Sequence, residues 1–249
     1  MVKILAIGNS FSQDATRYFK AVADAAGADA LVVNLYIGGC SLAQHFRNMH
    51  TENAAYELQW NGSNTGFYVS IQEALLSRNW DVITLQQASH DSGLPETYEC
   101  QGEVIDYVMT HKRNPDAVMY WHMTWAYQSD SDHWAFPRYD CDQTTMYNAI
   151  LNAVQTQILP NPAYTGVIPT GIAIRNLRAT PVGDTVTRDG FHMSESHGRY
   201  AAALTWALTL CGVDPDTVDW IPEAFAEAIR SDLEYIRRAV KEAGKAFLA

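Results

Sequence analysis

Basic residues are scarce in this sequence. Its 249 residues include 17 Lys and Arg against 28 Asp and Glu, which gives a formal net charge of −11. No cluster of Lys or Arg stands out anywhere along the chain. A surface of this charge repels phosphate groups, so nucleic acid and anionic membrane surfaces are poor partners for it.

Long apolar runs and paired cysteine motifs are also lacking. No run of about 18 apolar residues occurs, which argues against a transmembrane helix. The four cysteines show no CxxC spacing, which disfavours structural zinc and a dense disulfide framework but leaves one disulfide open. The chain shows no signal peptide before its first predicted strand, so we expect a cytoplasmic protein unless a signal segment has been removed.

Apolar runs rich in β-forming residues alternate with helical patterns along the chain. We predict strands at 2–7, 30–37, 80–85, 117–123 and 165–169. We predict helices at 12–26, 41–49, 68–77, 98–111, 142–159, 194–211 and 222–247. This alternation is typical of a parallel sheet with helices on both faces. Because no linker or repeat interrupts it, we expect a single domain over residues 1–249.

Two stretches depart from this rhythm. Residues 56–68 contain Asn61-Gly62 between apolar residues, which indicates a hairpin or another excursion from the alternation. Residues 124–140 are rich in aromatic side chains and follow the fourth strand. A long aromatic loop in this position is a natural wall for a binding cleft.

The first strand ends abruptly in Gly8-Asn9-Ser10, just before an amphipathic helix. Ligands of open α/β sheets bind at the carboxyl ends of the strands, where Ser10 is expected to lie. A hydroxyl beside a helix N-terminus also faces groups that favour developing negative charge. Ser10 is therefore either a nucleophile or a residue of a capping or anion-binding turn.

A second stretch, Asp189-Gly190-Phe191-His192, comes before the predicted helix 194–211. An Asp three residues before a His can place its carboxylate beside one ring nitrogen, leaving the other free for proton transfer. The alternative is an Asx-turn with a solvent-exposed histidine. A metal site is not expected, because His192, His197 and Asp189 lack a further ligand at the usual spacing.

Together, the Gly-Asn-Ser turn and the late Asp-x-x-His resemble the SGNH (GDSL-type) hydrolase superfamily. Within it, the block Gly8-Asn9-Ser10-Phe11-Ser12 is similar to a family of SGNH-like proteins of unknown function. The resemblance implies a flavodoxin-like three-layer α/β/α sandwich, with a five-stranded parallel sheet in the order 2-1-3-4-5. It also implies that Ser10 is the nucleophile, His192 the general base and acid, and Asp189 the carboxylate that orients it.

The superfamily's oxyanion hole combines two backbone N–H groups with an Asn side chain. By resemblance, the backbone donors are Ser10 and Gly39. Where the superfamily has its Asn, this chain has Gln86-Gln87, and we expect the Gln87 amide, or failing that Gln86, to replace it.

Other residues are candidates for contact with substrate. The candidates are Trp60, His90, His122 and Trp125. His122, at the end of the fourth strand, is either a substrate contact or a satisfied core histidine. Four further histidines, His45, His50, His111 and His133, are expected at the surface.

The resemblance implies a serine esterase acting on a small acyl ester without metal or cofactor, with an acetyl ester of a carbohydrate as the first substrate class. The first alternative is a non-catalytic module of the same fold that binds a carbohydrate or an anion. The second is a flavodoxin-type cofactor protein, although residues 9–13 contain fewer Ser, Thr and Gly residues than a phosphate-binding loop requires. The sequence leaves the oligomeric state open.

Overall fold

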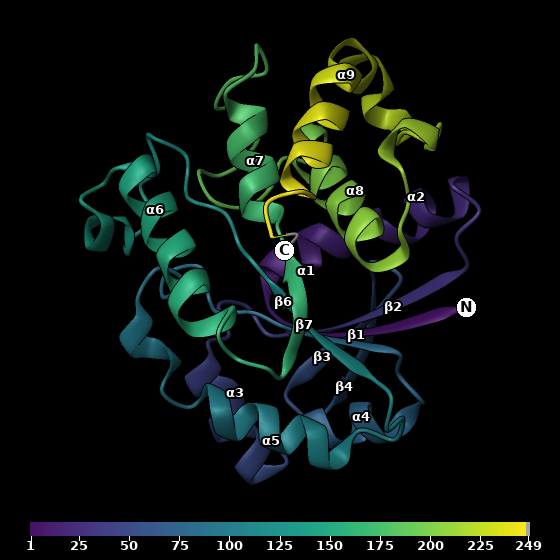
Figure 1. Cartoon of the computed structure of the whole chain (residues 1–249), viewed down its shortest axis with the longest axis vertical. Coiled ribbons are helices and arrows are strands. Elements are labelled where there is room, and N and C mark those ends of the chain that lie inside the picture. Colours follow the sequence, from purple (N-terminus) through teal and green to yellow (C-terminus); the bar gives the residue numbers. More distant parts are fainter. Residues whose placement is uncertain (248–249) are drawn as a thin grey trace.

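The computed structural model describes residues 1–247, in which a central sheet lies between two groups of helices (Figure 1). Residues 248 and 249 of the predicted domain lie outside the described part. Within it, the sheet has seven strands in the order β4-β3-β2-β1-β5-β6-β7. Its parallel strands are β1 (Val2–Gly8), β2 (Ala30–Tyr36), β5 (Val82–Leu85), β6 (Val118–His122) and β7 (Tyr164–Ile168).

An antiparallel hairpin extends this parallel core beyond β2. It consists of β3 (Tyr56–Trp60), which pairs with β2, and β4 (Ser63–Val69) at the sheet edge. Asn61 and Gly62 form its turn with φ angles of 49° and 79°, the left-handed conformations that a two-residue hairpin turn requires. The α/β class is confirmed. The prediction of a five-stranded, wholly parallel sheet is wrong, because the sheet is mixed and has two additional strands, β3 and β4.

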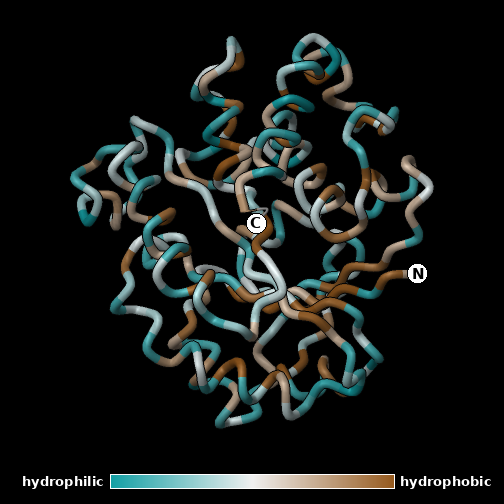
Figure 2. The backbone as a smooth tube through the Cα atoms, in the orientation of Figure 1, coloured by the Kyte–Doolittle hydropathy of each residue, from teal (hydrophilic) through white to brown (hydrophobic). Residues whose placement is uncertain are grey.

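Helices cover both faces of the sheet (Figure 1). On one face lie α3 (Leu42–Thr51), α4 (Ile71–Ser77) and α5 (Gln101–His111). On the other lie α1 (Ser10–Thr16), α2 (Phe19–Ala25), α7 (Thr170–Arg178), α8 (His197–Cys211) and α9 (Ala226–Ala243). The helix α6 (Gln143–Ala153) continues into a π-helical turn, Val154–Ile158, before β7. Because both faces are covered, the strands are apolar along most of their length, as Figure 2 shows for β1.

One helix prediction is wrong, and one helix was not predicted. The single helix predicted at 12–26 is two helices, α1 and α2, separated at Arg17 and Tyr18. The hairpin turn packs against this break, where the Arg17 guanidinium donates to the Gly62 carbonyl at 2.7 Å. A Cβ at position 62 would lie 2.6 Å from the Arg17 carbonyl oxygen, so only glycine fits there. The helix α7 was not predicted at all.

Candidate active site

The turn from β1 into α1 fixes Ser10 as the first residue of the helix. Asn9 is the N-cap, and its side-chain oxygen accepts a hydrogen bond from the Phe11 backbone N–H at 2.9 Å. The Ser12 hydroxyl completes the cap by accepting from the Asn9 backbone N–H at 3.1 Å. A Cβ at Gly8 would lie 2.2 Å from that hydroxyl oxygen, so glycine allows the helix to start close to the strand. Ser10 is 9% exposed at the carboxyl end of β1.

The segment before α8 holds an imidazole and a carboxylate in contact. His192 Nδ1 lies 2.6 Å from one oxygen of Asp189, whose other oxygen accepts from the backbone N–H groups of Phe191 and His192. The Asx-turn and the imidazole–carboxylate pair are therefore present together. Burial raises the pKa of Asp189, but its hydrogen bonds with His192 outweigh this, and the pKa is lowered below its ordinary value. Because an ionised carboxylate only accepts hydrogen bonds, the ring proton that faces Asp189 lies on Nδ1, and in the neutral tautomer Nε2 is then the free acceptor.

Ser10 and His192 open onto the same cavity, although 182 positions of sequence numbering separate them. Its volume is about 330 Å³, and it is lined by Ser10, Tyr36, Gly38, Gly39, Ser89, His90, His133, Trp134, Phe191 and His192. Within residues 1–247, neither the Ser10 hydroxyl nor His192 Nε2 makes a hydrogen bond to protein. Catalytic hydrogen bonds are often long before substrate binds, so both groups remain available to a ligand.

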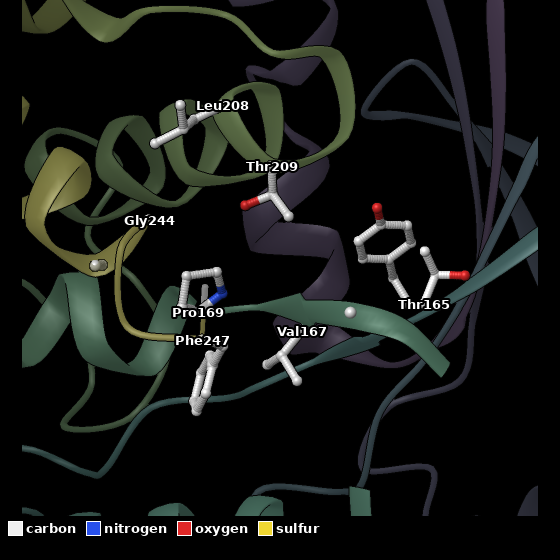
Figure 3. A pocket seen from close by; sticks show the side chains of 10 residues that line it. Thr165, Val167, Pro169, Leu208, Thr209, Gly244 and Phe247 are labelled. Atoms are coloured by element: carbon white, nitrogen blue, oxygen red, sulfur yellow. The ribbon is translucent and has the colours of Figure 1, made fainter. Parts of the chain in front are cut away.

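Another cavity, of about 350 Å³, lies between β7 and α8 (Figure 3). Figure 3 shows Thr165 and Val167 on β7 and Pro169 just beyond it, with Leu208 and Thr209 on the neighbouring α8. The described residues that line it include no histidine and no carboxylate. It therefore offers no general base, in contrast to the cavity at Ser10.

Of the predicted oxyanion donors, Ser10 and Gly39 lie at the cavity and the glutamines do not. Gly39 has a φ of 64° and faces open space at its Cβ position. The Asn9 amide donates to the neighbouring Cys40 carbonyl at 3.0 Å, which ties this turn to the Ser10 turn.

The amides of both glutamines are engaged elsewhere. Gln87 Nε2 donates to the carbonyl and the hydroxyl of Thr97, at 3.0 and 3.1 Å. Gln86 Nε2 donates to Asn9 Oδ1 at 2.6 Å. Each is 1% exposed and neither lines the cavity, so the structure does not support either as an oxyanion donor.

Among the predicted substrate contacts, only His90 lines the cavity. His122 is fully buried between the Gln86 side-chain oxygen at 2.8 Å and the Thr170 hydroxyl at 3.1 Å. Burial lowers the pKa of His122 to about 3, so it is neutral at physiological pH. Of the two alternatives, His122 is therefore the core histidine, with hydrogen-bond partners at both ring nitrogens.

Neither of the two predicted tryptophan contacts lines the cavity. Trp125 is fully buried and stacks on Phe11 with 4.2 Å between ring centroids, while its indole N–H donates to the Phe191 carbonyl at 2.7 Å. It therefore supports the site from within the core. Trp60 lies in the hairpin, where the Arg78 guanidinium covers its ring at 4.7 Å.

Sequence reasoning missed a buried carboxylate that joins the two halves of the site. Asp14 lies on α1, one turn beyond Ser10, and has no exposed surface. It contacts Arg188 at 2.9 Å and Arg199 at 2.8 Å, and accepts from the Met193 backbone N–H at 2.8 Å. Asp14 therefore fastens the helix of Ser10 to the segment that bears Asp189 and His192. The sequence held one signal for this burial. Asp14 lies four residues before Tyr18, which at helical spacing places it beside the apolar face of the predicted helix.

The aromatic stretch 124–140 contributes two cavity residues, in line with its interpretation as a cleft wall. Trp134 is 70% exposed, and its ring lies 5.3 Å from that of His90 and 5.5 Å from that of His133. His133 was expected at the surface but lines the cavity. His45, also expected at the surface, is fully buried, with Nδ1 at 2.9 Å from the Tyr56 hydroxyl.

Three further properties of the described part of the chain bear on its chemistry. Residues 1–247 contain no group of three or more His, Cys, Asp or Glu side chains that could hold a metal ion. The four cysteines are free thiols in the structure. In the same residues, no helix combines the length and the apolar character needed to cross a membrane.

Comparison with known proteins identifies the family that the chain matches. Residues 3–237 match the family model described as "Domain of unknown function (DUF4886)". The crystal structure of a DUF4886 family protein from Bacteroides uniformis is 34% identical to the chain. It superposes with a TM-score of 0.89, covering 98% of this chain and 94% of that one. No curated protein matches the sequence.

More distant structures share the fold. A proposed SGNH hydrolase from Slackia heliotrinireducens is 21% identical, with a TM-score of 0.53 over 84% of this chain and 98% of that chain. A member of the lipolytic protein G-D-S-L family from Veillonella parvula is 14% identical, with a TM-score of 0.53 over 85% of this chain and 99% of that chain. At these identities the likeness concerns the architecture.

Proposed function

The chain belongs to the DUF4886 family of domains of unknown function, and we propose that it is a serine esterase of the SGNH type. The observation that carries this proposal is the pairing of Asp189 with His192 at 2.6 Å on the cavity that Ser10 also lines. A hydroxyl, an imidazole and a carboxylate in this order are the minimum set for acyl transfer.

The reaction proceeds through an acyl-enzyme. His192 Nε2 takes the hydroxyl proton while Ser10 Oγ bonds to the ester carbonyl carbon, and the carbonyl oxygen becomes an oxyanion that the backbone N–H groups of Ser10 and Gly39 stabilise. The bond to the alcohol then breaks, and the alcohol leaves with the proton held by His192. In the second half, the oxygen of a water molecule bonds to the acyl carbon while His192 Nε2 takes a proton from that water. The bond between the acyl carbon and Ser10 Oγ then breaks, the acid leaves, and His192 returns the proton to Ser10 Oγ.

The cavity wall supports a small acyl group on a carbohydrate as the substrate. The cavity of about 330 Å³ suits a short acyl chain. Trp134, at its edge and 70% exposed, offers a flat aromatic face on which a sugar ring can stack. Acetyl esters of carbohydrates are therefore the first class to assay, and short acyl esters of simple alcohols the second.

A serine-directed probe and the Ser10→Ala variant test this proposal. A fluorophosphonate should label the wild type at Ser10, and Ser10→Ala should lose both labelling and turnover of p-nitrophenyl acetate, because no nucleophile remains. Loss of either Ser10 or His192 should reduce kcat by about 10⁴-fold or more. The measurements are initial rates and mass spectrometry of the labelled peptide.

Two results would count against the assignment. Full activity of Ser10→Ala would exclude Ser10 as the nucleophile. An unlabelled, inactive wild type that a carbohydrate stabilises against heat would instead favour the binding-module alternative.

A further inference from the structure

The proposed oxyanion hole lacks its third donor. Two backbone N–H groups are assigned to it, and the amides of Gln86 and Gln87 are bound elsewhere. The segment after β5 nevertheless contributes Ser89 to the cavity, together with Ser10 and Gly39. Ser89 is 7% exposed, and its hydroxyl oxygen lies 2.9 Å from the Tyr127 hydroxyl oxygen.

The direction of that hydrogen bond follows from His133. The Ala135 backbone N–H donates to His133 Nδ1 at 3.2 Å, so Nδ1 carries a lone pair and a neutral ring carries its proton on Nε2. Burial lowers the pKa of His133, with the charge of His90 acting in the same direction, which favours this neutral form. His133 Nε2 lies 3.5 Å from the Tyr127 oxygen, so its proton points toward that oxygen.

Tyr127 must then donate to Ser89. Its hydroxyl has two partners among residues 1–247, His133 and Ser89, and His133 offers a proton rather than a lone pair. Burial raises the pKa of Tyr127, which keeps its phenol protonated. Because Ser89 accepts that proton, its own hydroxyl hydrogen stays free to point into the cavity.

An ordinary turn role does not require the Ser89 hydroxyl. The turn is closed through the Ser89 backbone carbonyl, which accepts from the Ser92 hydroxyl at 2.8 Å. The side chain of Ser89 takes no part in that contact. Its hydroxyl therefore serves the cavity rather than the backbone.

From this geometry we infer that Ser89 is the third oxyanion donor and thus a catalytic residue of the proposed esterase. Tyr127 and His133 are positioning residues that direct the Ser89 proton toward the ester oxygen. The inference rests on the proposed function, because an oxyanion forms only if Ser10 attacks an acyl group.

Kinetics of the Ser89→Ala variant test this role. Loss of one oxyanion donor should lower kcat for p-nitrophenyl acetate by about 10²- to 10³-fold and leave KM within about threefold, since the donor acts in the transition state. Ser70→Ala is the control, because Ser70 is also a buried serine, its hydroxyl accepts from the Glu73 backbone N–H, and it lies outside the cavity. It should retain the wild-type rate.

Tyr127→Phe provides a second variant that keeps the ring in the core. It should lower kcat by about tenfold with KM unchanged, because the Ser89 hydroxyl loses its orienting donor. Affinity for a boronic acid that forms a tetrahedral adduct with Ser10 should fall in parallel with kcat/KM in both variants, which a purely structural role would not produce.

The outcomes separate the two proposals. If the wild type turns over and Ser89→Ala stays within about threefold of its kcat, the role of Ser89 is overturned and the esterase proposal stands. If the wild type neither turns over esters nor binds the probe at Ser10, both proposals fall.

Discussion

Individual residues of the site show how hydrogen-bond partners decide between chemical roles. Gln86 and Gln87 have the donor that an oxyanion needs, yet Asn9 and Thr97 occupy those donors at 2.6 and 3.0 Å. Ser89, two residues further on, opens onto the cavity. A family motif matches positions in the sequence, whereas the hydrogen-bond partners of each amide depend on the fold. The sequence alone therefore could not distinguish the two engaged glutamines from Ser89.

At Asp189 the same reasoning predicts a large effect from a change of one atom. In Asp189→Asn, the amide NH₂ would face His192 Nδ1 and favour the tautomer protonated on Nε2, which cannot take the Ser10 proton. We expect kcat to fall by about 10⁴-fold with the fold intact. The measurements are steady-state kinetics and circular dichroism.

At low pH, wild-type Asp189 should lose its contribution to the stability of the fold. Its pKa is lowered in the folded state, so its contribution to stability is present above the ordinary carboxyl value and is lost as pH falls through the lowered value. An Asp189→Asn variant with wild-type kcat would show that His192 needs no orienting carboxylate.

Among elements, those predicted best are the ones with a strong apolar pattern. The five buried strands have near-continuous apolar runs, and each was placed to within two residues of its observed ends. The edge strand β4 is largely exposed and relies on backbone pairing with β3, so its side chains carry little signal. The split of α1 from α2 depends on the hairpin turn packing at Arg17, which is a tertiary contact.

The junction of α1 with the segment before α8 yields a prediction at this scale. In Asp14→Asn, the guanidinium groups of the exposed Arg188 and the half-buried Arg199 would face a neutral amide in place of the buried carboxylate. The free energy of unfolding should fall by about 1.5–3 kcal/mol, the contribution of a hydrogen bond to a charged group. Activity should fall as well, because the His192 segment loses its attachment to the helix of Ser10. Urea unfolding and kcat provide the measurements.

Glu195→Gln is the matched control for that variant. Glu195 is an exposed partner of Arg199 at 3.1 Å, and losing an exposed pair should cost about 0–1 kcal/mol. If Asp14→Asn unfolded at the same urea concentration as Glu195→Gln, the buried junction would contribute no more than a surface pair.

For the whole molecule, the candidate site was predicted mainly from the order of two motifs along the chain. The hydroxyl of Ser10 lies at the end of β1, at the edge of the sheet where all the parallel strands end. The Asp-x-x-His segment follows α7 rather than a strand, and its contacts with Asp14 hold it beside Ser10. The substrate-facing residues were harder to predict. His122, Trp125 and His90 all lie at a strand end or within a few residues of one, so only tertiary packing determines which of them is covered. Residues of α7 and α8 cover His122, and Phe11 of α1 covers Trp125.

Two fully buried histidines give the whole fold a predictable response to acid. Burial lowers the pKa of His45 to about 4 and that of His122 to about 3, against an ordinary value near 6.5 in the unfolded chain. Between these values the unfolded chain binds more protons than the folded one. Stability should therefore fall as pH drops below about 6.5, by up to about 1.4 kcal/mol per pH unit for each histidine.

Urea unfolding of the wild type and of His122→Gln between pH 7 and pH 5 tests this origin. The variant should lose about half of the pH dependence that the two buried histidines supply, because a glutamine at position 122 does not titrate. His50→Gln is the control, since His50 is an exposed histidine outside the core. If His122→Gln kept the full slope of the wild type, the acid sensitivity would have to come from groups other than His122, and the neutral core histidine beneath Gln86 would not be its source.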